Sequence, residues 1–76
     1  MTTKEKIDEN LRVIGEGVRT LRKDAGLSQD KLAELSGYSR KTINEVERGI
    51  SNYHYETLVK ICEVLRTQVE TVLKPI

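Results

Sequence analysis

The chain has 76 residues, and its 13 Lys and Arg residues nearly balance its 12 Asp and Glu residues, giving a formal net charge of +1. So short a chain holds a single domain, which excludes an active-site cleft between domains. Cys62 is its one cysteine, which excludes an internal disulfide and any multi-cysteine metal site. A net charge this small gives no argument for a nucleic-acid partner, so any such attraction depends on how the charges are arranged.

The first predicted helix rests on apolar residues spaced four, three, four and three apart: Ile7, Leu11, Ile14, Val18 and Leu21. Thr2 and Glu5 form a candidate capping box at its start. Gly15 and Gly17 lie inside the helix, where each costs about 1 kcal/mol relative to Ala. Either these glycines permit close packing against a neighbouring helix, or residues 1–14 form a separate piece. We favour one long helix.

Between residues 28 and 49 the pattern shortens to two brief helices, separated only by Gly37 and Tyr38 and by the capping residue Ser39. Ser28 caps the earlier helix in the same way, and a glycine follows the last residue of each. The apolar positions of the two helices are Leu32, Ala33, Leu35, Ile43 and Val46.

A fourth helix is predicted from about Tyr55 to Leu65, and a short fifth one carries Val69 to Leu73 before Pro75 stops it. The buried stripe of the fourth helix consists of Leu58, Ile61, Cys62 and Leu65. No segment alternates with a period of two residues. The predicted fold class is therefore all-α, with five helices in one domain over residues 1–76.

The two brief helices form a candidate helix-turn-helix, because a turn this tight makes them cross steeply, at roughly 90–120°. With Ile43 and Val46 turned inward, the outward positions of the later helix hold Arg40, Lys41, Asn44, Glu45 and Arg48. Long hydrogen-bonding side chains of this kind suit the base edges of the DNA major groove. Every soluble helix also has a polar outer face, so composition alone leaves both interpretations open.

A series of motifs bears on this choice through the family that they resemble. They are Leu21-Arg22, Gly26-Leu27-Ser28-Gln29-Asp30-Lys31-Leu32-Ala33, Gly37-Tyr38-Ser39, Thr42-Ile43, Val46-Glu47-Arg48-Gly49 and Glu56-Thr57-Leu58. In these motifs and their spacing the chain resembles the lambda-repressor-like helix-turn-helix family, the group of Cro and the phage repressors. The resemblance covers about residues 14–73 and leaves residues 1–13 as an N-terminal extension of the first helix. It implies that the third helix lies in the major groove while the second crosses the DNA backbone.

The resemblance also implies roles for individual residues. Base-reading positions fall on Arg40, Lys41, Asn44 and Glu45. Phosphate contacts fall on Gln29, Ser39, Thr42, Arg48 and Asn52. Glu47 is expected to form a structural ion pair with Arg22. Tyr55, where the family carries Leu, is expected in the core, and Tyr53 at the rim of the DNA contact. His54 takes a helix-capping position where the family has Ser.

We expect the protein to act as a homodimer joined through the fifth helix and the end of the fourth. The proposed interface residues are Val69, Val72, Leu73 and Ile76, which offer more apolar surface than a short terminal helix can bury alone. A twofold dimer would place its two recognition helices roughly 34 Å apart and would bind a palindromic operator.

The leading interpretation is a DNA-binding transcriptional regulator or repressor of double-stranded operators, similar to phage repressors or restriction-modification controllers. No catalysis, cofactor, metal or small-molecule ligand is expected. One alternative is an antitoxin that represses its own operon and binds a toxin protein, for which residues 1–12 are the candidate segment. Another is a protein-interaction module that has lost DNA binding. Since no apolar run approaches the roughly 20 residues that span a bilayer, we expect a cytoplasmic protein without a membrane partner.

Overall fold

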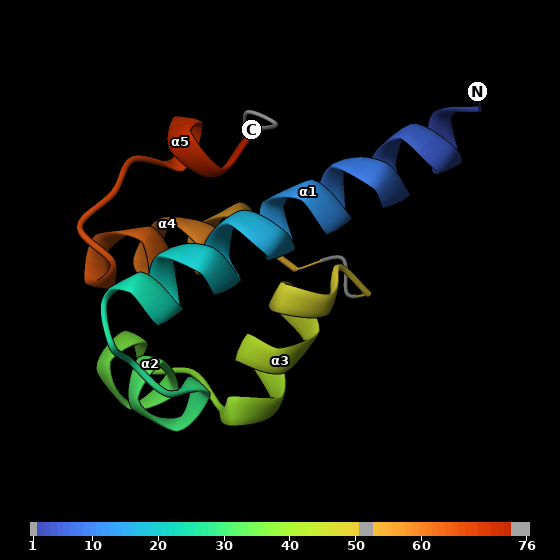
Figure 1. Cartoon of the computed structure of the whole chain (residues 1–76). Coiled ribbons are helices and arrows are strands. Elements are labelled where there is room, and N and C mark those ends of the chain that lie inside the picture. The colour runs from blue at the N-terminus through green and yellow to red at the C-terminus, as the bar shows by residue number, and fades with distance from the viewer. Residues whose placement is uncertain (1, 51–52, 74–76) are drawn as a thin grey trace.

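The computed structural model describes residues 2–50 and 53–73, and this part of the chain contains helices and no strand (Figure 1). The helices are α1 (Thr3–Asp24), α2 (Gln29–Ser36), α3 (Arg40–Arg48), α4 (Tyr55–Val64) and α5 (Val69–Leu73). The predicted all-α fold class is confirmed. None of the helices in the described ranges is both long enough and apolar enough to cross a bilayer.

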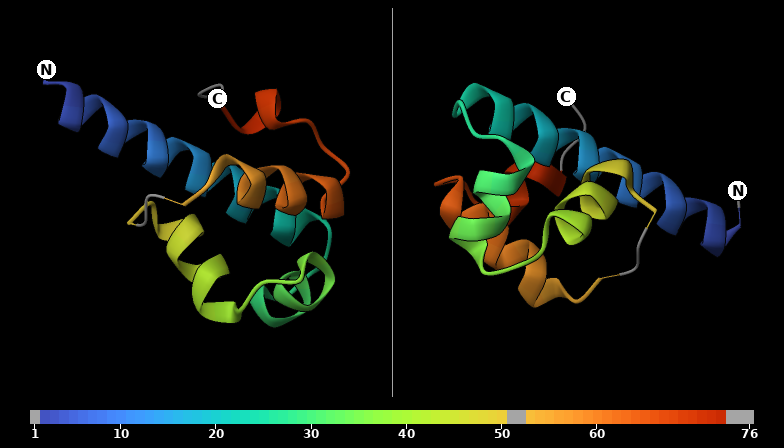
Figure 2. Two further views of the ribbon diagram at one scale, coloured as in Figure 1. Left: turned by 180° about the vertical axis from the view of Figure 1, so that it is seen from behind. Right: turned by 90° about the horizontal axis from the view of Figure 1, so that it is seen from below.

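Helix α1 is continuous over 22 residues, and its N-terminal turns project beyond the other helices (Figures 1 and 2). The predicted capping box is present. The Thr2 hydroxyl accepts from the Glu5 N–H at 3.2 Å, and the Glu5 carboxylate accepts from the Thr2 N–H at 3.2 Å. Ile7, on the projecting part, is 48% exposed, so the apolar stripe of α1 becomes core only from Ile14 onward.

Glycine allows α1 and the end of α3 to approach each other closely. A Cβ atom at Gly15 would lie 2.5 Å from the carbonyl oxygens of Val46 and Glu47. From the other side, Gly49 has a positive φ of +67°, and a Cβ there would lie 2.8 Å from the backbone of Arg12. The interpretation of the helix glycines as a close-packing device is therefore correct for Gly15, and a separate N-terminal piece is excluded.

The turn between α2 and α3 follows from the two caps predicted for it. Gly37 adopts the left-handed conformation, with φ 81°, and its N–H donates to the Ala33 carbonyl. Only Gly lies there without a Cβ penalty. Two residues later, the Ser39 hydroxyl accepts from the Thr42 N–H at 3.1 Å and starts α3. The chain thus turns sharply within a few residues and sets α3 beside α2 at a steep angle (Figure 1).

The core lies where α1, α2, α3 and α4 meet, and α5 closes one side against α1. The side chains that are almost wholly buried are Val18, Leu32, Ile43, Val46, Ile61, Cys62 and Val72. Cys62 is a core residue, and burial raises the pKa of its thiol, which keeps it protonated and unreactive. Leu35 differs from the other apolar residues of α2, because half of its surface is exposed.

Candidate nucleic-acid interface

Helix α3 has two sides with different surroundings. Ile43 and Val46 are buried in the core, as the spacing predicts. The four residues with predicted base-reading roles lie on the rest of the helix: Arg40 and Lys41 exposed, Asn44 and Glu45 partly buried. The side chains that could reach a base edge are thus on the accessible side of a short surface helix, and their contacts with bases remain a prediction.

Arg40 is oriented by a neighbour on α2. Its Nε lies 3.6 Å from the Asp30 carboxylate, and both side chains are about two-thirds exposed. An exposed pair of this kind contributes at most about 1 kcal/mol, so Arg40 is free to leave Asp30 for a stronger partner.

The residues with predicted phosphate contacts are placed around α2 and α3. Ser39 is exposed and Thr42 half-buried, and their hydroxyl oxygens are 3.0 Å apart, so Thr42 is already hydrogen-bonded inside the protein. Arg48 is exposed at the last turn of α3. Asn52 lies outside the described residues.

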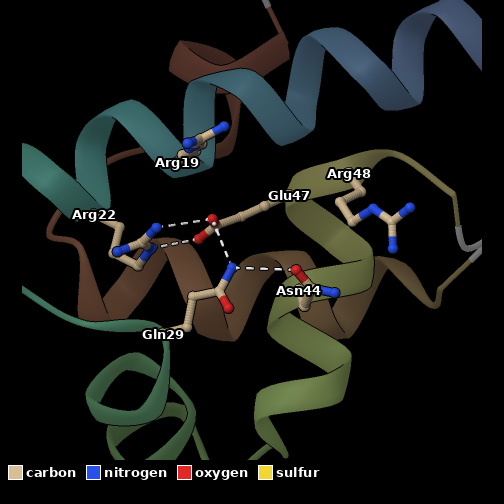
Figure 3. A pocket seen from close by; sticks show the side chains of 6 residues that line it. All are labelled: Arg19, Arg22, Gln29, Asn44, Glu47 and Arg48. Atoms are coloured by element: carbon tan, nitrogen blue, oxygen red, sulfur yellow. Dashed lines mark hydrogen bonds and ion pairs between the residues drawn. The ribbon is translucent and has the colours of Figure 1, made fainter.

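Arg22 and Glu47 form a buried ion pair that joins α1 to α3 (Figure 3). The Arg22 Nε and Nη2 atoms donate to Glu47 Oε2 and Oε1 at 2.6 and 3.0 Å, and Nη1 donates to the Leu27 carbonyl at 2.8 Å. The hydrogen bonds to Glu47 raise the pKa of Arg22 against the opposing effect of burial. A two-pronged, fully hydrogen-bonded pair of this geometry compensates the desolvation of both charges.

Gln29 extends this network toward the outer side of α3. Its Nε2 donates to Glu47 Oε1 at 3.1 Å and lies 3.5 Å from Asn44 Oδ1. The resemblance assigns Gln29 to a phosphate, but here its amide group faces Glu47 and Asn44 (Figure 3). A phosphate accepts hydrogen bonds and does not donate them. Gln29 could therefore bind one through its side chain only after giving up a hydrogen bond inside the protein.

The predicted dimer surface needs a correction at Val72. This residue is 1% exposed and packs on Gly17 of α1, so it belongs to the core of the single chain and offers no surface to a partner. Leu73 is 48% exposed and Val69 is half-buried, while Ile76 lies outside the described residues. Helical spacing could not separate Val72 from Leu73, because α5 is too short to show a periodic pattern.

Tyr53 and Tyr55, which flank His54, have environments that are the reverse of those predicted. Tyr55 is 67% exposed rather than in the core. Tyr53 packs against the core, and its hydroxyl is buried without a hydrogen-bond partner in the described structure. His54 occupies the N-cap position before α4, and its side chain makes no capping hydrogen bond, as expected for a residue that is a poorer cap than Ser.

Arg19 was not identified from the sequence. It is exposed on α1 and lines the same surface pocket as Arg22, Gln29, Asn44, Glu47 and Arg48 (Figure 3). The signal available was its position three residues before Arg22, which places both arginines on one face of the helix.

The comparisons with known proteins agree with this arrangement. The helix-turn-helix family HTH_3 matches residues 18–72. The control protein C.SmaI of Serratia marcescens is 39% identical over 61 residues, which cover 80% of this chain and 73% of that protein. The restriction-modification controller C.AhdI of Aeromonas hydrophila is 34% identical, with a TM-score of 0.80 and coverage of 84% of this chain and 97% of that one. SinR, a master regulator of biofilm formation solved in complex with DNA, is 32% identical, with a TM-score of 0.75 and coverage of 80% and 98%. The chain belongs to the helix-turn-helix family of transcription regulators.

Proposed function

We propose that the chain binds operator DNA sequence-specifically, with α3 in the major groove, and regulates transcription as a homodimer on a palindromic site. The observation that carries the proposal is the outer side of α3. Arg40 and Lys41 are exposed there next to Asn44, on a short helix held at the surface by the turn at Gly37. Arg and Lys match the acceptor atoms of guanine, and Asn matches adenine.

The kind of regulator is proposed from the relatives. C.AhdI is a restriction-modification controller, and this chain covers nearly all of it. C.SmaI is a control protein with 39% identity. We therefore favour a controller of the restriction-modification type over a phage repressor or an antitoxin.

The dimer is proposed to form through the groove between α4 and α5. This groove has a volume of about 460 Å³, and its lining includes Tyr55, Val59 and Leu73. Tyr55 and Leu73 are large apolar residues with 67% and 48% of their surface exposed. A second copy that packs the same groove against this one would remove both from water, and a twofold axis there would give two equivalent copies of α3.

The test begins with selection of bound duplexes from a random library, followed by measurement of Kd for the selected duplex and a scrambled one at fixed salt. We expect the selected sequence to be palindromic and to bind at least about 10³-fold more tightly than the scrambled duplex. Equal affinity for the two duplexes would contradict sequence-specific binding.

Sedimentation equilibrium tests the dimer separately. We expect Leu73→Glu to yield monomers, because it places a charge in the apolar interface. Ile7→Glu is the matched control, since Ile7 has the same 48% exposure but lies on the projecting part of α1. A wild-type protein that stays monomeric at micromolar concentration with and without the selected duplex would overturn the proposed dimer. So would loss of the dimer in Ile7→Glu alone, which would place the interface on α1.

A further inference from the structure

The pocket between α1, α2 and α3 has an excess of positive charge. Its volume is about 290 Å³, and three arginines line it together with one carboxylate, that of Glu47 (Figure 3). Arg22 compensates the charge of that carboxylate, because it donates to both of its oxygens. Among the described residues, neither Arg19 nor Arg48 takes part in an ion pair. Arg19 and Arg48 therefore both line this pocket without a carboxylate partner among the described residues.

The neutral residues of the pocket do not offset this excess. Gln29 directs its amide nitrogen at Glu47 Oε1 and toward Asn44 Oδ1, at 3.1 and 3.5 Å. Its two N–H hydrogens are thus already directed at acceptors within the protein. The free hydrogen-bond donors that remain at the rim are mainly those of Arg19 and Arg48, each with several N–H groups.

We propose that this pocket is an anion site that holds one DNA backbone phosphate between Arg19 of α1 and Arg48 of α3. The inference rests on the proposed function, because it deepens the contact made by the same face of the protein. It adds Arg19 as a binding residue and makes Gln29 a positioning residue, which holds Glu47 and Asn44 in place instead of carrying the phosphate by itself.

The chemistry of the pocket favours a phosphate within a polymer. A planar guanidinium donates to two oxygens of one phosphate, and two such groups can share a single anion. Both arginines are exposed, so the pocket is accessible to a strand that passes along the surface. Asn44 lines the pocket and also lies beside the outward residues of α3, so a strand whose bases meet α3 would bring its backbone to this rim.

The first test is the salt dependence of binding to the duplex selected from the random library. We expect Arg19→Gln to weaken binding about tenfold at low salt, as for loss of a charge-assisted hydrogen bond. It should also lower the slope of log Kd against log salt concentration by about one per protomer, with the preferred sequence unchanged. Arg19→Lys, which keeps the charge, should restore most of the slope.

The matched control is Arg66→Gln, which removes the same charge from an exposed residue outside the pocket. The double variant of Arg19 and Arg48 should lose less affinity than the product of the two single losses, because both side chains contact one phosphate. A slope for Arg19→Gln equal to that of Arg66→Gln would overturn the site, even if the wild type selects a sequence.

A titration with inorganic phosphate tests the site without DNA. In an NMR experiment on the wild-type chain, we expect the guanidinium signals of Arg19 and Arg48 to shift together, while that of Arg66 does not. If the wild type selects no duplex, the proposed function fails, and this titration alone decides the site. Shifts confined to Arg19 and Arg48 would support the site, and equal shifts at all three arginines, or none, would overturn it.

Discussion

The two sides of α3 differ in how firmly they are held. On the inner side, Glu47 is buried, and its carboxylate accepts from both Arg22 and Gln29. On the outer side, Arg40 has one exposed contact with Asp30 at 3.6 Å, and Lys41 is exposed. The inner side therefore fixes where α3 lies, while the outer side is free to meet a ligand. Substitutions on the two sides should affect different measurements.

The largest effect is expected from Glu47→Ala, which would leave the Arg22 guanidinium buried without its partner. Breaking such a pair costs about 3–5 kcal/mol of unfolding free energy. In a domain of this size, a loss of that order lowers Tm by about 15 °C or more, as differential scanning calorimetry would measure. Glu34→Ala is the control, because Glu34 forms only an exposed pair with Lys31 at 3.5 Å. An unchanged Tm in Glu47→Ala would show that the inner side is not held by this pair.

Gly15 and Gly17 allow a steric test of the contact between α1 and the inner side of α3. Gly15→Ala would push a Cβ against backbone atoms of α3 at 2.5 Å, so we expect a loss of about 3 kcal/mol, at the upper end of the range for overpacking. Gly17→Ala meets only Val72, at 3.4 Å, and gains helix propensity of up to about 1 kcal/mol. In urea denaturation, the free energy of unfolding should therefore be lower than that of the wild type for Gly15→Ala and higher for Gly17→Ala. Equal stability of both would mean that α1 and α3 are not in close backbone contact.

On the outer side, Arg40→Ala and Lys41→Ala should leave Tm unchanged and weaken binding to the selected duplex. We expect about 1–3 kcal/mol per half-site for each, with relaxed preference at individual base pairs. Fluorescence anisotropy with a labelled duplex measures the change in Kd. If either substitution lowered Tm as much as Glu47→Ala does, the division between the two sides of α3 would be incorrect.

The smallest effect concerns Tyr53, where a buried polar atom lacks the partners that Glu47 has. Tyr53→Phe removes the hydroxyl without a partner and should raise the unfolding free energy by about 1 kcal/mol. Burial raises the pKa of Tyr53 from 10.0 to about 12. Between these pH values the unfolded chain has released the phenolic proton and the folded chain has kept it, so wild-type stability falls as pH rises through this window.

The Phe variant should lose that part of the pH dependence, which chemical denaturation at pH 9 and pH 11 would measure. An identical decline in both proteins would indicate that the Tyr53 hydroxyl is hydrated in solution.

Local signals in the sequence predicted most of the fold. The capping residues Ser28 and Ser39 and the glycines after α2 and α3 act within a few positions of the chain, so their effects can be read directly. The family motif placed Glu47 opposite Arg22, residues 25 positions apart, which composition could not have done. These contacts were predictable because each needs a specific residue type.

The predictions that failed depend on tertiary packing. The reversed environments of Tyr53 and Tyr55 depend on how the start of α4 packs on the core, and the burial of Val72 beside the exposed Leu73 depends on how α5 lies on α1. Because α5 is only five residues long, the spacing of its apolar residues cannot show whether Val72 or Leu73 faces the core. The pocket that Arg19 shares with Arg48 likewise joins residues of α1 and α3, and only the folded chain brings them together.

The central claim is that the outer side of α3 reads the DNA sequence. It is tested most directly by repeating the selection from a random duplex library with Arg40→Ala, Lys41→Ala, Asn44→Ala and Glu45→Ala, each compared with the wild type. We predict that each variant which still folds, as judged by its Tm, selects a sequence altered at one or two base pairs per half-site, in symmetric positions. If all four variants fold and select the wild-type sequence unchanged, α3 is not the reading helix and the account is contradicted.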